Sequence, residues 1–312
     1  MSFLRRKDKK RKTPWRTAES QWDEQDAKSQ WDEQYSRRLC AEIREFNINI
    51  GTRDRREMER VMANLLVLGP AKAGKSAFIN SVLSISSGRR LRTADSADYE
   101  FGTVTTKYSI YGGDGEVDNI QLHDTPGLME QEGQGFNSEN FIPLIDGHIE
   151  DGYEFQRERG INESDPNYRP NSTRRDKINC VVFVVDVSTL KTLTDNYTQQ
   201  IRALQNVLVD KGIPQVLLLT KCDKLSKHAR KNTANIFRSK RIEKYVKYAG
   251  SKFGIQQSYI HPIVNYGENP DGLDEKVNIP ILLALRQMVY FAGDYLENQV
   301  QVERSTPENT TG

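Results

Sequence analysis

The sequence predicts an α/β domain built on a mostly parallel six-stranded sheet, with one antiparallel strand and helices on both faces. Two observations lead to this prediction. Apolar runs of strand length alternate with amphipathic stretches of helix length between residues 64 and 296. A glycine-rich motif, Gly-Pro-Ala-Lys-Ala-Gly-Lys-Ser at residues 69–76, lies between one such run and a helical stretch. This strand, loop and helix sequence is the context that a phosphate-binding loop requires.

Six segments have the length and apolar content of strands. The strongest contains the continuous run from Val181 to Val185, which indicates a strand buried on both faces. A Gly-Gly-Asp-Gly turn at 112–115 joins the second segment to the third, so these two are expected to pair antiparallel. Pro262 places the last strand at an edge of the sheet. The expected strands are 64–68, 106–111, 118–123, 178–187, 216–220 and 259–265.

Helices are expected between these strands. The closing helix is the clearest, because its apolar residues recur at 281, 282, 285, 288, 289, 292 and 296. A further helix is expected over 140–149, inside a long acidic segment between Leu128 and Lys177. The other expected helices are 75–85, 195–211 and 232–252.

The chain divides into four parts by composition. Residues 1–38 are basic and polar, carry two copies of Ser-Gln-Trp-Asp-Glu-Gln, and are expected to be poorly ordered. The repeats are read as a duplicated solvated segment or as an element that docks a partner. Residues 39–60 form a helical lead-in, 61–298 the nucleotide-binding domain, and 299–312 a flexible tail.

Charge and cysteine content exclude several classes of protein. The net charge of the 312 residues is +2, so the molecule as a whole is not built to hold a polyanion, and no specific nucleic-acid binding is expected. Cys40, Cys180 and Cys222 are odd in number and widely spaced, which is typical of a reducing compartment. No apolar stretch approaches the roughly 20 residues of a membrane span. We therefore expect an intracellular protein.

The motif at 69–76 predicts a phosphate site. Backbone N–H groups from about Lys72 to Ser76, including those of Ala73 and Gly74, are expected to converge on the β-phosphate at a helix N-terminus. Ala77, the next residue, is also expected to contribute to nucleotide binding. Gly69 and Gly74 allow the backbone to approach the phosphates closely. Lys75 is expected to span the β- and γ-phosphates, and the Ser76 hydroxyl to bind Mg²⁺. The Lys72 side chain is expected to face solvent rather than to act as a second phosphate ligand.

A second motif, Asp-Thr-Pro-Gly at 124–127, follows the third expected strand. Asp124 is expected to hold Mg²⁺ through a water molecule. The Gly127 N–H is expected to bind the γ-phosphate, so that the following loop senses whether this phosphate is present. With the phosphate loop, this motif predicts a Ras-like P-loop NTPase domain.

The choice of base is assigned to Thr-Lys-Cys-Asp at 220–223. Asp223 can accept hydrogen bonds from N1–H and the 2-amino group of guanine, a pair that adenine does not offer. The stem of Lys221 can stack on the base. Thr220 stands where Asn is usual, and its hydroxyl could tie this segment to the phosphate loop. Asn265 and Tyr266, after the last strand, are expected to hold the base through backbone N–H and the Tyr266 ring.

A threonine cluster follows Gly102 and lies between the two phosphate motifs. One of these threonines is expected to bind Mg²⁺ and the γ-phosphate in the GTP state. Distance to the next strand favours Thr105 as metal ligand and catalytic residue, with Thr103 and Thr106 as alternatives.

The residues needed for GTP hydrolysis are less complete than those expected to bind the nucleotide. Leu128 occupies the position after Asp-x-x-Gly where Ras-like proteins place a glutamine that orients water, and an apolar side chain cannot do this. Turnover is therefore expected to be slow unless another group acts. The candidates are a group from a partner chain, one of the nearby residues Glu130, Gln131, Glu132 and Gln134, or an internal arginine among Arg89, Arg90 and Arg92.

The residues also resemble a known group, the interferon-induced protein 44 and 44-like family of GTP-binding proteins. The similarity covers about residues 60–298. It includes Ala-Phe-Ile-Asn-Ser-Val at 77–82, Ile-Pro-Leu-Ile-Asp-Gly-His-Ile at 142–149, Asp-Lys-Ile-Asn-Cys-Val at 176–181 and Ala-Leu-Arg-Gln-Met at 284–288. The resemblance implies a Ras-like G domain, a cytoplasmic location and a role in innate immune or antiviral response. Typical members carry an N-terminal TLDc domain, for which residues 1–60 are too few.

Together these features predict a GTP- and GDP-binding protein that uses Mg²⁺ and acts as a slow GTPase switch. The alternative is a nucleotide-binding scaffold that assembles, for example as a homodimer or with a protein effector, and hydrolyses little. The basic run from Arg5 to Lys12 is read as a solvated tail, a nuclear-import signal, or a weak contact to anionic membrane surfaces.

Overall fold

The computed structural model of the chain describes residues 8–11, 13–16, 31–46, 49–51, 58–94, 107–112, 115–128, 140–156, 159–267 and 272–305. The threonines at 103, 105 and 106, the candidate water-positioning residues at 130–134 and the first hexapeptide repeat at 20–25 lie outside these ranges. Within the described ranges, every helix is too short or too polar to act as a membrane span.

The centre of the molecule is a six-stranded sheet with the order β4-β5-β3-β6-β7-β8. β4 pairs antiparallel with β5, and all the other pairs are parallel. This confirms the predicted sheet, including an edge position for the strand that contains Pro262. The strands are β3 (Ala63–Leu68), β4 (Ser109–Gly112), β5 (Ile120–Asp124), β6 (Cys180–Asp186), β7 (Gln215–Thr220) and β8 (Ile260–Pro262).

The strand register brings the polar ends of β5, β6 and β7 to one edge of the sheet, beside the end of β3. All residues of β3 and β6 are buried, as their apolar runs require when helices cover both faces. Val67 of β3 lies beside Asp124 at the end of β5, and Asp186 at the end of β6 lies beside Thr220 at the end of β7. Ligands of open α/β sheets bind outside the carboxyl ends of the strands, so this edge is the place to look for a site.

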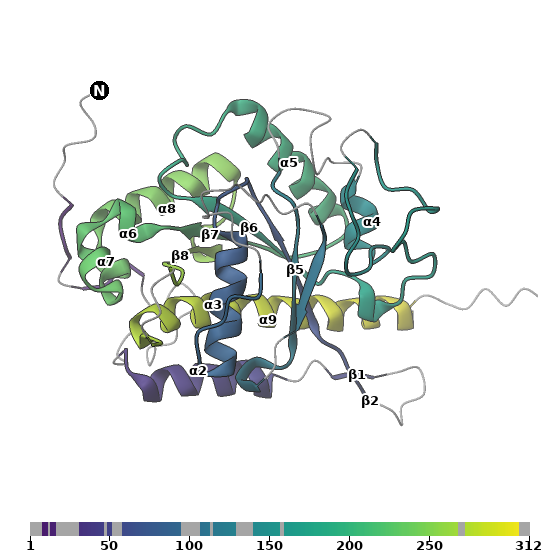
Figure 1. Ribbon diagram of the computed structural model, residues 1–312, viewed down its shortest axis with the longest axis horizontal. Helices are drawn as coiled ribbons and strands as arrows, with labels where there is room; N and C mark the ends of the chain where they lie inside the picture. Colours follow the sequence, from purple (N-terminus) through teal and green to yellow (C-terminus); the bar gives the residue numbers. More distant parts are fainter. Residues whose placement is uncertain are drawn as a thin grey trace, which may run out of the picture.

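Helices cover both faces of the sheet (Figure 1). α3 (Lys75–Ser87) and the long α9 (Glu275–Ser305) pack against each other, and α9 crosses β3, β6, β7 and β8. α5 (Asp195–Asp210) and α8 (Lys240–Phe253) pack together above the sheet in the view of Figure 1. The predicted helices on both faces are confirmed.

The helix expected over 232–252 and the closing helix differ from their predicted bounds. The single helix expected over 232–252 is instead a 3-10 helix, η6 (Thr233–Arg238), followed by α8. Ser239 separates them, because its Oγ accepts the N–H of Ile242 at 3.2 Å and caps α8. α9 begins at Glu275 and accommodates Pro280 near its start, where the sequence reading expected a helix only after the proline.

The N-terminal part is more structured than expected. α2 (Glu33–Glu45) begins within the stretch expected to be poorly ordered, and Asp32 of the second repeat caps it by accepting the N–H of Tyr35 at 3.0 Å. α2 packs on α9 (Figure 1) and Arg286 forms an ion pair with Glu42 at 2.6 Å. β1 (Asn49–Gly51) and β2 (Met58–Arg60) form an antiparallel pair that was not predicted. Residues 8–11 and 13–16 also pack on the domain, as described below.

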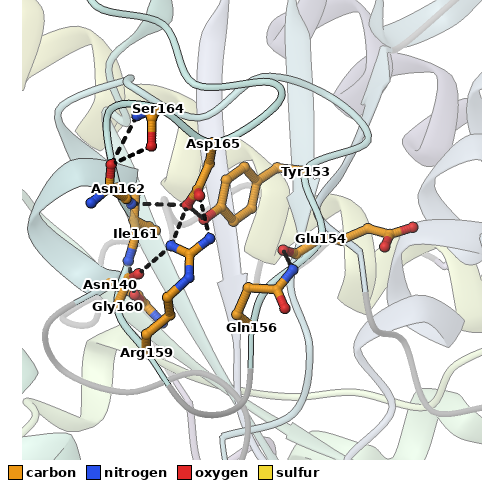
Figure 2. Close-up of polar contacts among 10 residues, drawn as sticks. All are labelled: Asn140, Tyr153, Glu154, Gln156, Arg159, Gly160, Ile161, Asn162, Ser164 and Asp165. Atoms are coloured by element: carbon orange, nitrogen blue, oxygen red, sulfur yellow. Dashed lines mark hydrogen bonds and ion pairs between the residues drawn. The ribbon is translucent and has the colours of Figure 1, made fainter.

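The described part of the long segment before Lys177, residues 140–156 and 159–176, forms a layer beside β4. It contains the short α4 (Phe141–Ile145), which ends at Ile145, earlier than the expected 149. Figure 2 shows its polar centre: the Asp165 carboxylate pairs with Arg159 and accepts hydrogen bonds from the Tyr153 hydroxyl at 2.7 Å and the Asn162 N–H at 2.9 Å. The pKa of Asp165 lies well below its ordinary value, chiefly because Arg159 donates a hydrogen bond to its carboxylate.

This layer fixes the chain just after the threonine cluster. The Tyr108 N–H donates to the carbonyl of Tyr153 at 2.8 Å, and the Tyr108 hydroxyl bonds the buried ring of His123 on β5. Burial lowers the pKa of His123 to about 3, so the ring stays neutral. The chain that follows the threonine cluster is thereby tied to β5, the strand that ends in Asp124.

Candidate nucleotide-binding site

The loop at residues 69–76 connects β3 to α3 at the carboxyl edge of the sheet. Lys72 has a φ of 62° and Gly74 a φ of 98°, so the loop turns sharply before α3 begins at Lys75. The first N–H groups of a helix have no partner within the helix. Those of α3 therefore point out of the loop as donors for an anion.

Two glycines are required by close backbone packing. A Cβ on Gly69 would lie 2.2 Å from the carbonyl oxygen of Val184, and a Cβ on Gly127 would lie 2.6 Å from the Ala71 nitrogen. The chain after β5 thus lies directly against the phosphate loop, where the Leu128 N–H donates to the Gly69 carbonyl at 3.0 Å. The predicted phosphate loop and the Asp-x-x-Gly segment form one continuous surface.

Lys75 is held inside this loop. Its side chain is buried, and its Nζ donates to the carbonyls of Gly69 and Pro70, each at 3.2 Å. Burial lowers the pKa of Lys75, and the charge of Asp124 partly opposes this shift. An anionic phosphate would supply the stronger partner that a buried ammonium requires.

Ser76 and Asp124 form the candidate metal site. The Ser76 hydroxyl donates to Oδ2 of Asp124 at 2.9 Å, and both residues are buried. A hydroxyl and a carboxylate are hard oxygen ligands of the kind that Mg²⁺ prefers, with phosphate oxygens and water completing its shell. Among the described residues there is no cluster of three His, Cys, Asp or Glu side chains, so a metal held by protein side chains alone does not fit there.

Two side chains from the base-recognition segments hold consecutive carbonyls of the phosphate loop. The Thr220 hydroxyl donates to the Ala73 carbonyl at 2.6 Å, as the sequence predicts. Nδ2 of Asn265 donates to the next carbonyl, that of Gly74, at 3.0 Å. A Cβ on Gly74 would lie 3.2 Å from Asn265 Nδ2 and 3.4 Å from Thr220 Oγ1. Asn265 therefore supplies an amide contact to the loop although Thr220 stands where Asn is usual.

Lys221 bridges two other parts of the site. Its backbone has a φ of 57°, and its Nζ donates to the Lys72 carbonyl at 2.7 Å and pairs with Asp186 at 3.0 Å. Asp186 was not predicted from the sequence as a site residue. Its position at the end of a buried parallel strand could have indicated it, because the carboxyl ends of such strands form the binding edge of the sheet. The pKa of Asp186 lies below its ordinary value because hydrogen bonds from Ser188 and Lys221 together outweigh the opposing effect of burial, which is the largest single contribution.

Asp223 lies at the start of α6 (Cys222–Leu225), half-buried beside Lys221. Its carboxylate has no hydrogen-bond or ion-pair partner within the described part of the chain, while its carbonyl accepts from Arg230 Nε at 3.2 Å. Cys222 next to it is fully buried, and burial raises the pKa of its thiol, which favours a packing role over redox chemistry. An open carboxylate at the carboxyl edge is what the predicted contact with guanine needs.

Tyr266 differs from its predicted arrangement. Its N–H donates to the Ser81 hydroxyl at 3.0 Å, its hydroxyl donates to Asn278 at 2.7 Å, and Arg90 lies over its ring at 4.0 Å. Arg90 also donates to the Gly267 carbonyl. The N–H and one ring face of Tyr266 therefore already have partners, and Tyr266 links α3 to α9. Arg90 binds the loop that carries Tyr266 and Gly267.

Three other residues were predicted to belong to the site: Lys72, Ala77 and Thr105. Lys72 is exposed, as expected, and serves the site through its carbonyl. Ala77 lies in the first turn of α3, next to Ser76. Thr105 lies outside the described residues, so its assignment to Mg²⁺ stays a prediction.

Leu128 is part of the hydrophobic core, with 7% of its surface exposed. We expect Leu128→Ala to lower the free energy of unfolding by about 2–5 kcal/mol, because it deletes a buried leucine side chain. The rate of GTP hydrolysis should stay unchanged, since a buried apolar group orients no water. Urea denaturation and phosphate release measure the two effects. Ile142→Ala is the control, because Ile142 is 46% exposed and its loss should cost little stability. A Leu128→Ala protein of undiminished stability would contradict this placement.

Comparison with known proteins agrees with the geometry. Residues 64–221 match the protein family described as 50S ribosome-binding GTPase. The chain is 31% identical over 238 residues to interferon-induced protein 44 of Homo sapiens, covering 75% of this chain and 53% of that protein. It is equally 31% identical to interferon-induced protein 44-like of Homo sapiens, covering 75% of this chain and 52% of that protein. The resemblance predicted from the motifs is confirmed, and the chain spans about half the length of these curated relatives.

The chain is also similar to solved structures. A crystal structure of Era in complex with MgGDPNP and a segment of 16S ribosomal RNA aligns with a TM-score of 0.34 and 14% sequence identity. The alignment covers 66% of this chain and 52% of that chain.

Proposed function

The chain belongs to the GTPase family described as 50S ribosome-binding GTPase, and we propose that it is a GTP-binding protein of the interferon response that works as a slow GTPase switch. The interferon role is inferred from similarity to the interferon-induced protein 44 proteins. The single observation that supports nucleotide binding best is the pair Ser76 and Asp124, 2.9 Å apart, beside the buried ammonium of Lys75.

The residues of this chain divide the work of holding GTP. Lys75 and the N–H groups at the start of α3 would neutralise and orient the phosphates. Ser76 and Asp124 would hold Mg²⁺, whose chemistry is to draw charge from the β- and γ-phosphate oxygens. Asp223 would accept from the guanine edge, while Lys221 keeps the base segment against the phosphate loop through the Lys72 carbonyl. The Gly127 N–H would report on the γ-phosphate, because Gly127 lies so close to the phosphate loop that a Cβ there would be 2.6 Å from the Ala71 nitrogen.

Slow turnover follows from Leu128. Its side chain is buried and its N–H is bonded to Gly69, so neither group is available to orient a water molecule. The same observation favours the second candidate function, a nucleotide-dependent scaffold that assembles across the nucleotide face and hydrolyses little GTP.

Single-turnover phosphate release, measured over a range of protein concentrations, separates the two functions. A slow rate that does not depend on concentration supports the switch. A rate that rises with protein concentration indicates that a second copy completes the site. No release at any concentration would rule out the enzyme and leave the scaffold.

A further inference from the structure

Part of the chain's basic head, the run from Arg5 to Lys12, docks on the domain: its described residues 8–11 lie on the domain together with residues 13–16. Residues 8–11 and 13–16, here called the N-terminal strap, run beside α7 (Lys227–Lys231) in Figure 1 and reach η6 and α8. The Arg11 N–H donates to the Arg238 carbonyl at 2.8 Å, and the Lys240 N–H donates to the Lys9 carbonyl at 3.1 Å. These bonds make Lys10 an antiparallel bridge partner of Ser239. Backbone pairing of this kind is how an extended peptide is recognised by a folded domain.

Asp8 joins the caps of two helices. One carboxylate oxygen accepts from Ser226 Oγ at 2.5 Å and the other from Ser239 Oγ at 2.9 Å. Both serines are fully buried, and they cap α7 and α8 by accepting the N–H groups of Ala229 and Ile242. The carboxylate also lies near the N-terminus of α8, where the helix dipole favours a negative charge.

The other end of the strap is anchored by an aromatic ring and a buried cation. Trp15 meets Phe237 edge to face, with ring centroids 5.8 Å apart. Arg16 is 3% exposed, donates to the Ser258 carbonyl at 2.5 Å, and lies 3.4 Å from Nδ1 of His261. Arg11, between the two ends, pairs with Glu243 at 3.0 Å. In a solvated tail these side chains would be surrounded by water. Here the domain provides a specific partner for each of them, so it has a binding surface for the strap.

This surface is continuous with the guanine-recognition segment. Ser226 holds Asp8 through its hydroxyl, and its N–H donates to the Cys222 carbonyl at 3.0 Å. The second bond closes α6, the helix that carries Asp223. Arg230 of α7 donates to the Asp223 carbonyl at 3.2 Å. Asp8 thus acts on a serine that lies only three residues beyond Asp223.

We propose that the surface formed by Ser226, Ser239, Phe237 and Glu243 is a peptide-binding site for the chain's own N-terminal strap, and that strap docking fixes the guanine-recognition segment and slows nucleotide release. The nucleotide part rests on the proposed function. The docked strap and an exposed basic head are then two alternative states, and any partner that takes up the basic head also loosens the nucleotide.

Asp8→Ala in the full chain tests this, with Lys9→Ala as the matched control, because Lys9 is exposed and contributes its carbonyl to docking. Two readouts are needed: trypsin cleavage after Arg11, and the release rate of a fluorescent guanine nucleotide. We expect Asp8→Ala to speed both, nucleotide release roughly tenfold, the effect of losing a hydrogen bond to a charged group. Lys9→Ala should match the wild type in both.

The outcomes separate the parts of the proposal. Unchanged cleavage in Asp8→Ala would overturn strap docking. Faster cleavage with unchanged nucleotide release would overturn the coupling to the guanine site. A wild-type chain that binds no guanine nucleotide would instead refute the proposed function, while the trypsin assay still tests docking. If Asp8→Ala does not fold, Trp15→Ala removes the aromatic anchor without touching the serine caps and should give the same two changes.

Discussion

Lys75→Ala is expected to abolish measurable GTP binding. Lys75 would give the phosphates charge-assisted hydrogen bonds of about 1.5–3 kcal/mol each, so the loss of two corresponds to roughly 10²–10⁴-fold in affinity. The buried ammonium now bonds the carbonyls of Gly69 and Pro70, and no other described cation is buried in the loop. Equilibrium titration with a fluorescent guanine nucleotide measures the change.

Lys72→Ala is the matched control for this experiment. Lys72 belongs to the same loop, but its side chain is exposed and its carbonyl alone contacts the base-recognition segment. Its affinity for GTP should equal that of the wild type. Wild-type affinity in Lys75→Ala, with the melting temperature unchanged, would show that the phosphates bind elsewhere.

Asp223→Asn is expected to change the preferred base from guanine to xanthine. The carboxylate accepts two N–H groups from guanine, whereas the amide offers one donor and one acceptor, which fits the carbonyl that xanthine carries in place of the 2-amino group. Affinity for GTP should fall by about 10²–10⁴-fold, and XTP should bind more tightly than GTP.

Competition between GTP, XTP and ATP for one fluorescent nucleotide measures this preference. Lys224→Ala serves as the control, since Lys224 is the exposed neighbour of Asp223 and its side chain makes none of the site contacts described above. An unchanged preference in Asp223→Asn would mean that the base is read by other residues.

Local signals predicted the sheet and the phosphate site because both depend on short stretches of chain. The run from Val181 to Val185 is apolar enough to demand burial on both faces, and it became β6. The glycine motif requires a strand before it and a helix after it, and β3 and α3 provide them. The Thr220 contact with the phosphate loop was predictable because a hydroxyl at the end of a parallel strand faces that loop.

Long-range contacts account for what the sequence did not predict. Asn265 reaches Gly74 across 191 positions, and nothing in either local sequence indicates the pairing. Tyr266 was expected at the base, but Ser81 and Arg90 compete for its N–H and its ring. For the basic run from Arg5 to Lys12 the sequence indicates a solvated tail, a nuclear-import signal or a membrane contact, but not docking, because the two serine caps that bind Asp8 lie more than 200 positions away.

The central claim is that the site selects a guanine nucleotide together with Mg²⁺. The most direct test is displacement of a fluorescent GDP analogue from the purified full chain by GTP or ATP, with Mg²⁺ present and then removed by a chelator. We predict that GTP displaces the analogue, that ATP at the same concentration does not, and that chelation weakens GTP binding. Equal displacement by ATP and GTP, or no binding of the analogue under either condition, would contradict this account.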